Sequence, residues 1–282
     1  IRDLLRYAVS RFTQEKLFFG HGTDNAYDEA VYLILHTLSL PIDRLDPFLD
    51  AKLLPSEITQ VLSIIERRIT ERIPAAYLTH EAWLQDYSFY VDRGVIVPRS
   101  FIAELIVEQF APWINNPDNI SNILELCTGS GCILLSLLHY SNDCSGVGAD
   151  LSEEALEVAR KNAEQLGESS ALFVQGDLFA PVEGKFEIIV SNPPYICSDV
   201  IPTLMEEVRE HEPMQALDGG ADGLDFYRKI IQGAKEHLCG GGQLFFEIGY
   251  DQGEAVQRLM EQAGYREVEC VQDFAGLDRV VF

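Results

Sequence analysis

The sequence predicts an α/β protein with a mostly parallel sheet, preceded by a small helical domain. Two observations carry this prediction. The first 75 or so residues place apolar side chains at helical spacing. From Ile120 onward, predicted strands and helices alternate along the chain, which is typical of a parallel sheet covered by helices on both faces.

Three helices are expected in residues 1–75. The first spans Asp3–Phe12. Asp24 can cap the second and Ser56 can cap the third, because short polar side chains accept hydrogen bonds from the free N–H groups of a helix start. The third helix should stop before Pro74, since proline removes a backbone donor. This pattern predicts a small helical bundle.

Residues 76–114 lose the helical spacing of the front segment and are predicted to form a linker. The apolar runs Phe89–Val91 and Val95–Val97 flank Asp92-Arg93-Gly94, which predicts a β-hairpin with a turn at the glycine. The segment Phe101–Phe110 is expected to be helical. The linker therefore combines a hairpin with one helix.

The polar segment Asn115–Asn119 contains Pro117, and we place the start of the second domain, residues 115–282, there. Strands are expected at Ile123–Leu126, Gly146–Asp150, Ala171–Val174, Phe186–Val190, Leu244–Ile248, Arg266–Cys270 and Val280–Phe282. Helices are expected at Cys132–His139, from the Ser152 cap through Leu166, at Leu224–Leu238 and at Gln252–Ala263.

Length, cysteines and histidines restrict the class of protein. The 282 residues leave room for one large domain and a small one. No apolar run approaches the roughly 18 residues needed to span a bilayer, and we recognise no signal peptide, so we expect a cytoplasmic protein. The six cysteines are scattered without a Cys-x-x-Cys pair, which predicts reduced thiols. The six histidines form no ligand-spaced cluster, which predicts no metal site.

The net charge of −24 bears on the partner. Affinity for nucleic acid depends largely on lysine and arginine neutralising phosphates, and here 21 basic residues face 45 acidic ones. A basic protein would instead be attracted, although acidity can also serve solubility alone. We expect a monomer with a protein substrate, no membrane contact and no direct nucleic-acid specificity.

A glycine-containing turn follows the first predicted strand of the second domain. Gly129 and Gly131 permit unusual backbone angles and close approach of a ligand. The turn leads into a helix, whose free N–H groups can meet a carboxylate or a ribose oxygen. Cys132 follows directly, so the third glycine of the dinucleotide fingerprint is missing, which argues against a pyrophosphate. The glycines could also only turn the chain.

Acidic residues end the next two strands. Asp150 can take both hydroxyls of a ribose. Asp177 can meet the amino group of an adenine, with Leu178 against the ring. Either acid could instead only cap the segment that follows it. Because three strand ends converge on one side of the sheet, we favour a nucleoside pocket.

The tetrapeptide Asn192-Pro193-Pro194-Tyr195 directly follows the apolar run Phe186–Ser191. In an open α/β sheet, ligands bind beyond the carboxyl ends of the strands. Asn192 offers a side-chain acceptor and Pro193 a carbonyl that has no competing N–H. Tyr195 can lie against a planar group. These features suit a flat substrate NH2 group; a tight loop with an exposed tyrosine is the alternative.

With these motifs, the chain resembles the glutamine-amide methyltransferases of the HemK family. The resemblance covers essentially the whole chain, and its specific motifs are Ala76-Tyr77-Leu78-Thr79, Val97-Pro98-Arg99-Ser100, Ser191-Asn192-Pro193-Pro194-Tyr195 and His211-Glu212-Pro213. The front half, with Gly20–Asn25 and Cys127–Cys132, is similar to the branch that modifies a large-subunit ribosomal protein. The back half, with Phe246–Gly249, Gln252–Val256 and Asp278–Val281, is more similar to the release-factor branch.

This resemblance implies a class I methyltransferase that uses S-adenosyl-L-methionine. Its fold is Rossmann-like, with a mostly parallel seven-stranded sheet, a small N-terminal helical domain and a β-hairpin linker. The expected domains are a substrate-recognition domain at 1–75, the linker at 76–114 and the catalytic domain at 115–282. The implied reaction methylates the side-chain nitrogen of a glutamine in a ribosomal protein or a peptide-chain release factor.

The resemblance also assigns roles to residues. The expected cofactor contacts are Glu125 at the methionine end, Thr128, Gly129, Ser130 and Gly131 in the turn, Asp150 on the ribose, Asp177 or Leu178 at the base, and Asn192. Asn192, Pro193 and Tyr195 are the expected catalytic residues, and Pro194 and Glu212 join them in binding substrate. For Glu212 a loop-bracing role is nearly as plausible. Cys127 should only fill the turn.

Three other functions compete with this one. Adenine amino methylation of nucleic acid would use the same tetrapeptide on a similar NH2 group, but the acidic balance speaks against it. A non-catalytic cofactor-binding protein would not need the intact tetrapeptide. A nicotinamide oxidoreductase is the most distant alternative.

Overall fold

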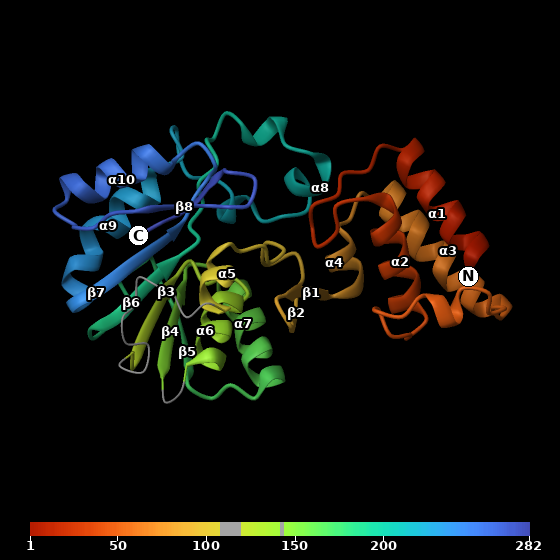
Figure 1. Cartoon of the computed structure of the whole chain (residues 1–282), viewed down its shortest axis with the longest axis horizontal. Coiled ribbons are helices and arrows are strands. Elements are labelled where there is room, and N and C mark those ends of the chain that lie inside the picture. The colour runs from red at the N-terminus through yellow and green to blue at the C-terminus, as the bar shows by residue number, and fades with distance from the viewer. Residues whose placement is uncertain (108–119, 142–143) are drawn as a thin grey trace.

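The structure is a computed structural model that describes residues 1–107, 120–141 and 144–282. Figure 1 shows a helical domain at one end and a sheet flanked by helices at the other, with α4, the strands β1 and β2, and α8 between them. The predicted Asn115–Asn119 boundary and the last part of the predicted Phe101–Phe110 helix lie outside the described residues. The domain division at residues 75 and 115 therefore stays a prediction.

The front domain is the predicted helical bundle. Its elements are α1 (Arg2–Gln14), α2 (Ala26–Thr37), the short 3-10 helix η1 (Asp46–Phe48) and α3 (Pro55–Thr70). Phe12, Leu33 and Ile65, one from each long helix, have no exposed surface. Each such buried side chain contributes roughly 1.5–3 kcal/mol of transfer free energy, so packing of the three apolar faces holds the bundle together.

Two predicted helix caps are displaced by one or two residues. Asn25, and not Asp24, caps α2, with its side-chain oxygen accepting from the N–H groups of Tyr27 and Asp28, both at 3.0 Å. The helix α3 begins at Pro55, whose missing N–H costs nothing in a first turn. The predicted Ser56 cap is therefore wrong.

The hairpin lies earlier in the chain than predicted, because the predicted first arm, Phe89–Val91, overlaps its second strand. Its strands are β1 (Glu81–Leu84) and β2 (Tyr87–Tyr90), paired antiparallel. The predicted second arm, Val95–Val97, is not a strand; Val95 and Val97 are buried in a cluster that includes Ala155 and Val158 of α7. This apolar run therefore reflects packing against a helix and not strand pairing. The short helix α4 (Ala75–Thr79) precedes the hairpin and α5 (Ile102–Val107) follows it.

The second domain contains the predicted mostly parallel seven-stranded sheet. Its strand order is β5-β4-β3-β6-β7-β9-β8, and only the pairs made by β9 are antiparallel. The strands are β3 (Asn122–Leu126), β4 (Ser145–Asp150), β5 (Ala171–Gln175), β6 (Phe186–Ser191), β7 (Leu238–Glu247), β8 (Cys270–Gln272) and β9 (Asp278–Val281). The strand order reverses between β3 and β6, which is where open α/β sheets bind ligands.

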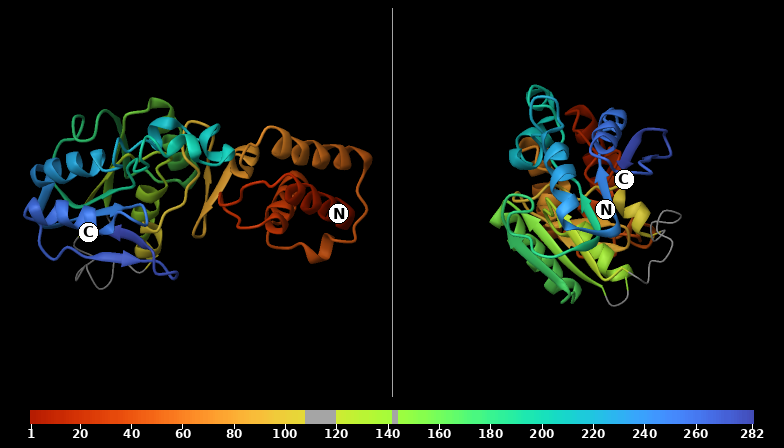
Figure 2. Two further views of the ribbon diagram at one scale, coloured as in Figure 1. Left: turned by 90° about the horizontal axis from the view of Figure 1, so that it is seen from above. Right: turned by 90° about the vertical axis from the view of Figure 1, so that its left-hand side faces the viewer.

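Helices cover both faces of this sheet, as Figure 2 shows. The helices are α6 (Cys132–Tyr140), α7 (Glu153–Leu166), α9 (Asp225–His237) and α10 (Gly253–Gln262). The first two share one buried cluster with α5, and the last two share another. This two-sided burial explains why the central strands read as continuous apolar runs. No helix in the part of the chain that the structure describes is long and apolar enough to cross a membrane.

The segment between β6 and α9 leaves the sheet and reaches the front domain. It contains the 3-10 helix η3 (Ile201–Thr203), α8 (Glu206–Arg209) and the 3-10 helix η4 (Met214–Ala216). Figure 1 shows α8 beside the front domain, at the far end of this segment from the sheet. The chain that follows the tetrapeptide therefore connects the two domains.

A buried arginine ties α8 to the front domain. Arg68 of α3 has no exposed surface. Its guanidinium donates to Glu29 at 2.7 Å and to Glu207 at 3.3 Å, and also to the carbonyl of Phe18 at 2.7 Å. Glu207 accepts a further hydrogen bond from the Phe18 N–H at 3.0 Å. We call Arg68, Glu29, Glu207 and Phe18 the junction cluster.

Candidate active site

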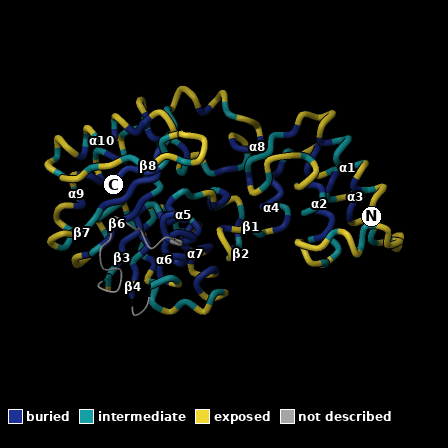
Figure 3. The backbone as a smooth tube through the Cα atoms, in the orientation of Figure 1, coloured by how far each residue is buried: buried dark blue, intermediate teal, exposed yellow. Residues whose placement is uncertain are grey.

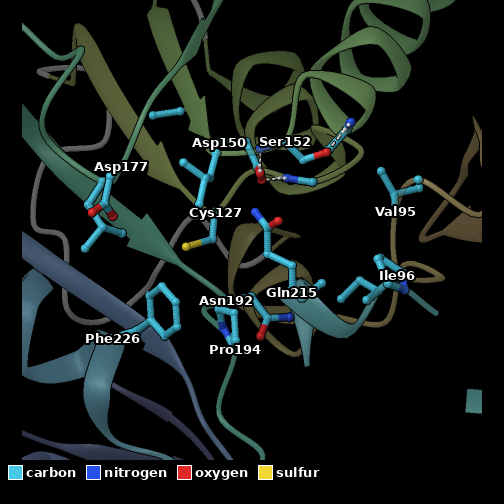
Figure 4. Close-up of a pocket in the computed structure, with 18 of the residues that line it drawn as sticks. Val95, Ile96, Cys127, Asp150, Ser152, Asp177, Asn192, Pro194, Gln215 and Phe226 are labelled. Carbon is cyan, nitrogen blue, oxygen red and sulfur yellow. Dashed lines mark hydrogen bonds between the residues drawn. The ribbon is translucent and has the colours of Figure 1, made fainter. Parts of the chain in front are cut away.

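A pocket opens at the carboxyl ends of β3, β4, β5 and β6, beside the point where the strand order reverses (Figure 4). It encloses about 790 Å³ of space, a figure that includes open solvent at its mouth. The predicted site residues that line it are Gly129, Asp150, Asp177, Leu178, Asn192 and Pro194.

The turn after β3 has the unusual backbone that its glycines predicted. Gly129 and Gly131 have φ values of 54° and 75°, and nothing lies within 4 Å of where a Gly129 Cβ would be. A ligand can therefore approach this backbone closely. Cys127 also has a positive φ, 58°, although it carries a side chain. Burial raises the pKa of its thiol, so the predicted role as an unreactive filler of the turn fits the structure.

Asp150 both caps the backbone around it and lines the pocket. One carboxylate oxygen accepts from the Gly129 N–H at 2.8 Å and the other from the Ser152 N–H at 2.9 Å. Figure 4 shows this carboxylate at the wall of the pocket. Burial raises the pKa of Asp150, while the two N–H groups lower it. The carboxylate thus braces the glycine turn and still presents itself to the pocket.

Glu125 is not among the residues that line the pocket, and its expected contact with the methionine end of a cofactor stays a prediction. Its side chain is buried beneath the turn, where it accepts from the Thr128 hydroxyl and from the Leu134 N–H at 3.2 Å. Burial raises its pKa to about 8. Thr128, Ser130 and Gly131 are likewise absent from the lining of the pocket. They belong to the turn beside it, and their expected contacts with a cofactor stay predictions.

The tetrapeptide at the end of β6 is fixed on both sides. The hydroxyl of Ser191 donates to the carbonyl of Leu126 at 2.8 Å, which ties β6 to β3. On the other side, the Gln252 amide donates to the carbonyl of Tyr195 at 3.0 Å. Asn192 is half-buried and lines the pocket. Pro193 and Tyr195 are not among the lining residues, and Tyr195 packs against the buried cluster that α9 and α10 share.

Two glycines of the run Gly219–Gly223 hold the tetrapeptide by close packing, which sequence reasoning missed. A Cβ on Gly219 would lie 2.7 Å from the Cα of Tyr195, and one on Gly223 would lie 2.4 Å from the Tyr195 carbonyl oxygen. Only glycine fits at such distances from a backbone. The signal was present in the sequence, because three glycines cluster in Gly219-Gly220-Ala221-Asp222-Gly223.

Glu212 braces loops and is not among the residues that line the pocket, so its expected contact with substrate stays a prediction. Its carboxylate is buried and accepts from the Arg99 guanidinium at 3.3 and 3.4 Å and from the Val97 N–H at 3.5 Å. The ring nitrogen Nε2 of His21, itself buried, lies 3.2 Å away. The alternative reading of Glu212 as a brace therefore holds.

Several pocket residues carried no sequence signal. Ile96 comes from the linker, Gln215 from the turn η4 and Phe226 from the start of α9. They lie far apart along the chain, and none stands at a strand end. Tertiary folding alone brings them to the pocket.

The doubly covered parallel sheet, with its pocket at the strand reversal, defines a class I S-adenosylmethionine-dependent methyltransferase fold. Residues 103–209 match the family model Methyltransferase small domain. The ribosomal protein uL3 glutamine methyltransferase of Neisseria gonorrhoeae is 53% identical over 252 residues, which are 89% of this chain and 84% of that protein. The corresponding protein of Xanthomonas campestris is 41% identical over 282 residues, 96% of this chain and 91% of that one. The chain therefore belongs to the family of ribosomal protein uL3 glutamine methyltransferases.

These relatives also test the expected resemblance of the front and back halves to two different branches of the family. The alignment with the Neisseria gonorrhoeae protein runs over 89% of the chain, so the front and back halves match the same relative. The expected release-factor character of the back half finds no support. The glutamine methyltransferase identification stands without it.

Solved structures agree on the fold at low sequence identity. A methyltransferase from Pyrococcus furiosus has a TM-score of 0.52 and 20% identity, covering 70% of this chain and 88% of that one. The hMettl16 catalytic domain in complex with MAT2A 3'UTR hairpin 6 has a TM-score of 0.55 and 12% identity, covering 80% and 81%. At these identities the likeness concerns the fold alone.

Proposed function

We propose that this chain transfers a methyl group from S-adenosyl-L-methionine to the side-chain amide nitrogen of a glutamine in ribosomal protein uL3. The relatives are named for their substrate, ribosomal protein uL3. Their identity of 53% and 52% over most of the chain supports the same substrate for this chain. The observation that carries the chemistry is a single pocket lined by both Asp150 and Asn192. In this proposal, Asp150 contacts the nucleoside of the cofactor and Asn192 contacts the substrate amide within the same cavity.

Three features of the pocket support binding of the cofactor. Its wall at Gly129 has no side chain to obstruct a ligand, and Asp150 supplies a carboxylate suited to ribose hydroxyls. Leu178 and Phe226 provide apolar wall for a purine. When bound there, S-adenosylmethionine supplies a methyl group on a positively charged sulfur.

Asn192 is the residue that we assign to the substrate amide. An amide nitrogen is a poor nucleophile because its lone pair is delocalised into the carbonyl. The side-chain oxygen of Asn192 can accept one of the substrate's two N–H hydrogens, and the carbonyl of Pro193 is the proposed acceptor for the other. Tyr195 and Pro194 complete the proposed substrate wall. Positioning of this kind supplies a large part of a rate enhancement without a strong general base.

Mass spectrometry of the methylated product tests this function. Purified ribosomal protein uL3, a peptide-chain release factor and duplex DNA are each incubated with the chain and isotopically labelled S-adenosylmethionine. The expected result is one labelled methyl group on a glutamine of the ribosomal protein. Label on the release factor alone would show that the release factor is the substrate. Label on DNA alone would favour adenine methylation of nucleic acid.

A further inference from the structure

The pocket has a wall that comes from outside the sheet. Pro213, Gln215 and Ala216 belong to the segment around η4 and line the pocket together with the ends of the strands. Figure 4 shows the Gln215 side chain extending into the pocket, toward Asp150 and Cys127. The carboxamide of Gln215 thus lies on the side of the pocket that holds the acidic end of β4.

The carboxamide of Gln215 is free to bind a ligand. It makes no side-chain hydrogen bond within residues 1–107, 120–141 and 144–282, and the residue is exposed. A carboxamide offers two donors and one acceptor. The walls nearby include Ile96, Leu178 and Phe226, all apolar. A polar group placed among apolar walls is the usual means by which a pocket fixes the orientation of its ligand.

The backbone that carries Gln215 is held on both sides. Within the turn, the N–H of Ala216 donates to the carbonyl of Pro213 at 2.9 Å. After the turn, the carbonyl of Leu217 accepts from the Ile196 N–H at 3.0 Å. Before it, the buried Glu212 carboxylate is bound by Arg99. Because the turn is already ordered, a ligand that meets Gln215 has little backbone entropy to overcome.

We propose that Gln215 is a cofactor-binding residue whose carboxamide hydrogen-bonds to the nucleoside half of S-adenosylmethionine. This inference rests on the proposed function and adds a residue to its site. The direction of the side chain toward Asp150 selects the nucleoside half, since Asp150 is the expected partner of the ribose. Ribose hydroxyls and purine nitrogens both match a group that donates and accepts.

Isothermal titration calorimetry of the full chain tests the contact without turnover. The ligands are S-adenosylhomocysteine and adenosine. We expect Gln215→Ala to weaken binding of both by about 3- to 10-fold, the range of one net hydrogen bond. Gln215→Glu keeps the size of the side chain and loses the NH2 donor, so it should weaken binding at least as much. Met214→Ala is the matched control, because Met214 lies in the same turn, is 53% exposed and does not line the pocket.

Three outcomes would overturn the proposal or part of its basis. Equal affinity of Gln215→Ala and the unchanged chain for both ligands would remove Gln215 from the cofactor site. Weaker binding of S-adenosylhomocysteine with unchanged binding of adenosine would reject the nucleoside half. If the unchanged chain binds neither ligand, the proposed function itself fails. A melting temperature that matches across the variants verifies that each has folded.

Discussion

The strand-end pocket and the junction cluster both depend on polar side chains, but they use them in opposite ways. Asn192 and Gln215 in the pocket are accessible to a ligand. Arg68 in the junction is fully buried, and its charge is met by two carboxylates and a carbonyl. Figure 3 shows the wider burial pattern, with buried backbone in the strands of the sheet and exposed residues along the outer helix α10. The Asn192 and Gln215 side chains are available to bind a ligand, whereas the hydrogen bonds of Arg68 stabilise the fold. Changes in the first region should therefore alter activity, and changes in the second should alter stability.

The largest expected effect is on stability, from Arg68→Ala. This change leaves Glu29 and Glu207 buried without their main counter-charge, which costs about 3–5 kcal/mol of unfolding free energy. Arg67→Ala is the matched control, because the neighbouring Arg67 side chain is 52% exposed and pairs with a Glu71 that is 49% exposed. Exposed pairs are worth about 0–1 kcal/mol. Urea unfolding of both variants measures the difference, and similar losses in the two would refute the importance of the junction.

The next effect is on catalysis, from Asn192→Ala. Removing one aligned polar group that acts in the transition state costs about 10²-fold or more in turnover. The melting temperature should hardly change, since Asn192 is half-buried and lines an open pocket. Turnover is followed with a purified protein substrate and labelled cofactor. Retained turnover in a folded Asn192→Ala chain would remove Asn192 from the catalytic site.

A smaller catalytic effect is expected from Gly219→Ala. The added Cβ would lie 2.7 Å from the Cα of Tyr195, so the tetrapeptide must shift. We expect a loss of about tenfold, below the roughly 10²-fold that a full 1 Å misplacement can cost. Gly240→Ala is the control, because nothing lies within 4 Å of its added Cβ. Comparing the turnover of the two variants tests the packing; equal turnover would show that Gly219 does not set the position of the loop.

A pH dependence of stability is expected from Glu125, whose carboxyl is buried beneath the turn. Burial raises its pKa to about 8 from 4.5, so the folded chain holds a proton that the unfolded chain releases. This contribution to stability is complete below pH 4.5 and is lost as the pH rises through about 8. Glu125→Gln, which cannot ionise, should therefore gain melting temperature relative to the unchanged chain between pH 5 and pH 8.5, roughly the window over which the linkage acts. A constant offset across this range would contradict the shift.

The structure corrects several predicted elements, among them the second arm of the hairpin and the strand Arg266–Cys270, of which only Cys270 belongs to β8. The apolar run Val95–Val97 was predicted as a strand, but it packs against Ala155 and Val158 of α7 without pairing. Alternating apolar residues report which side chains are buried, and they do not report what covers them. The true hairpin, β1 with β2, begins several residues earlier.

Features that depend on residues close together along the chain could be predicted from the sequence. The alternation of apolar runs specified the sheet, the glycines specified the turn after β3, and the position of Asn192 after a strand placed it at the pocket. Each of these depends on residues within a few positions of one another, and the edge of a parallel sheet then brings the strand ends together.

The contacts that join the helical bundle to the sheet, and the wall that closes the pocket, depend on the fold as a whole. Arg68 meets a carboxylate 139 residues away, and Gln215 reaches the pocket from a turn far from any strand end. No local spacing encodes such contacts, because a charged or amide side chain in a helix or a turn looks the same in sequence whether water or another segment satisfies it. Burial decides between the two, and burial follows from the fold as a whole.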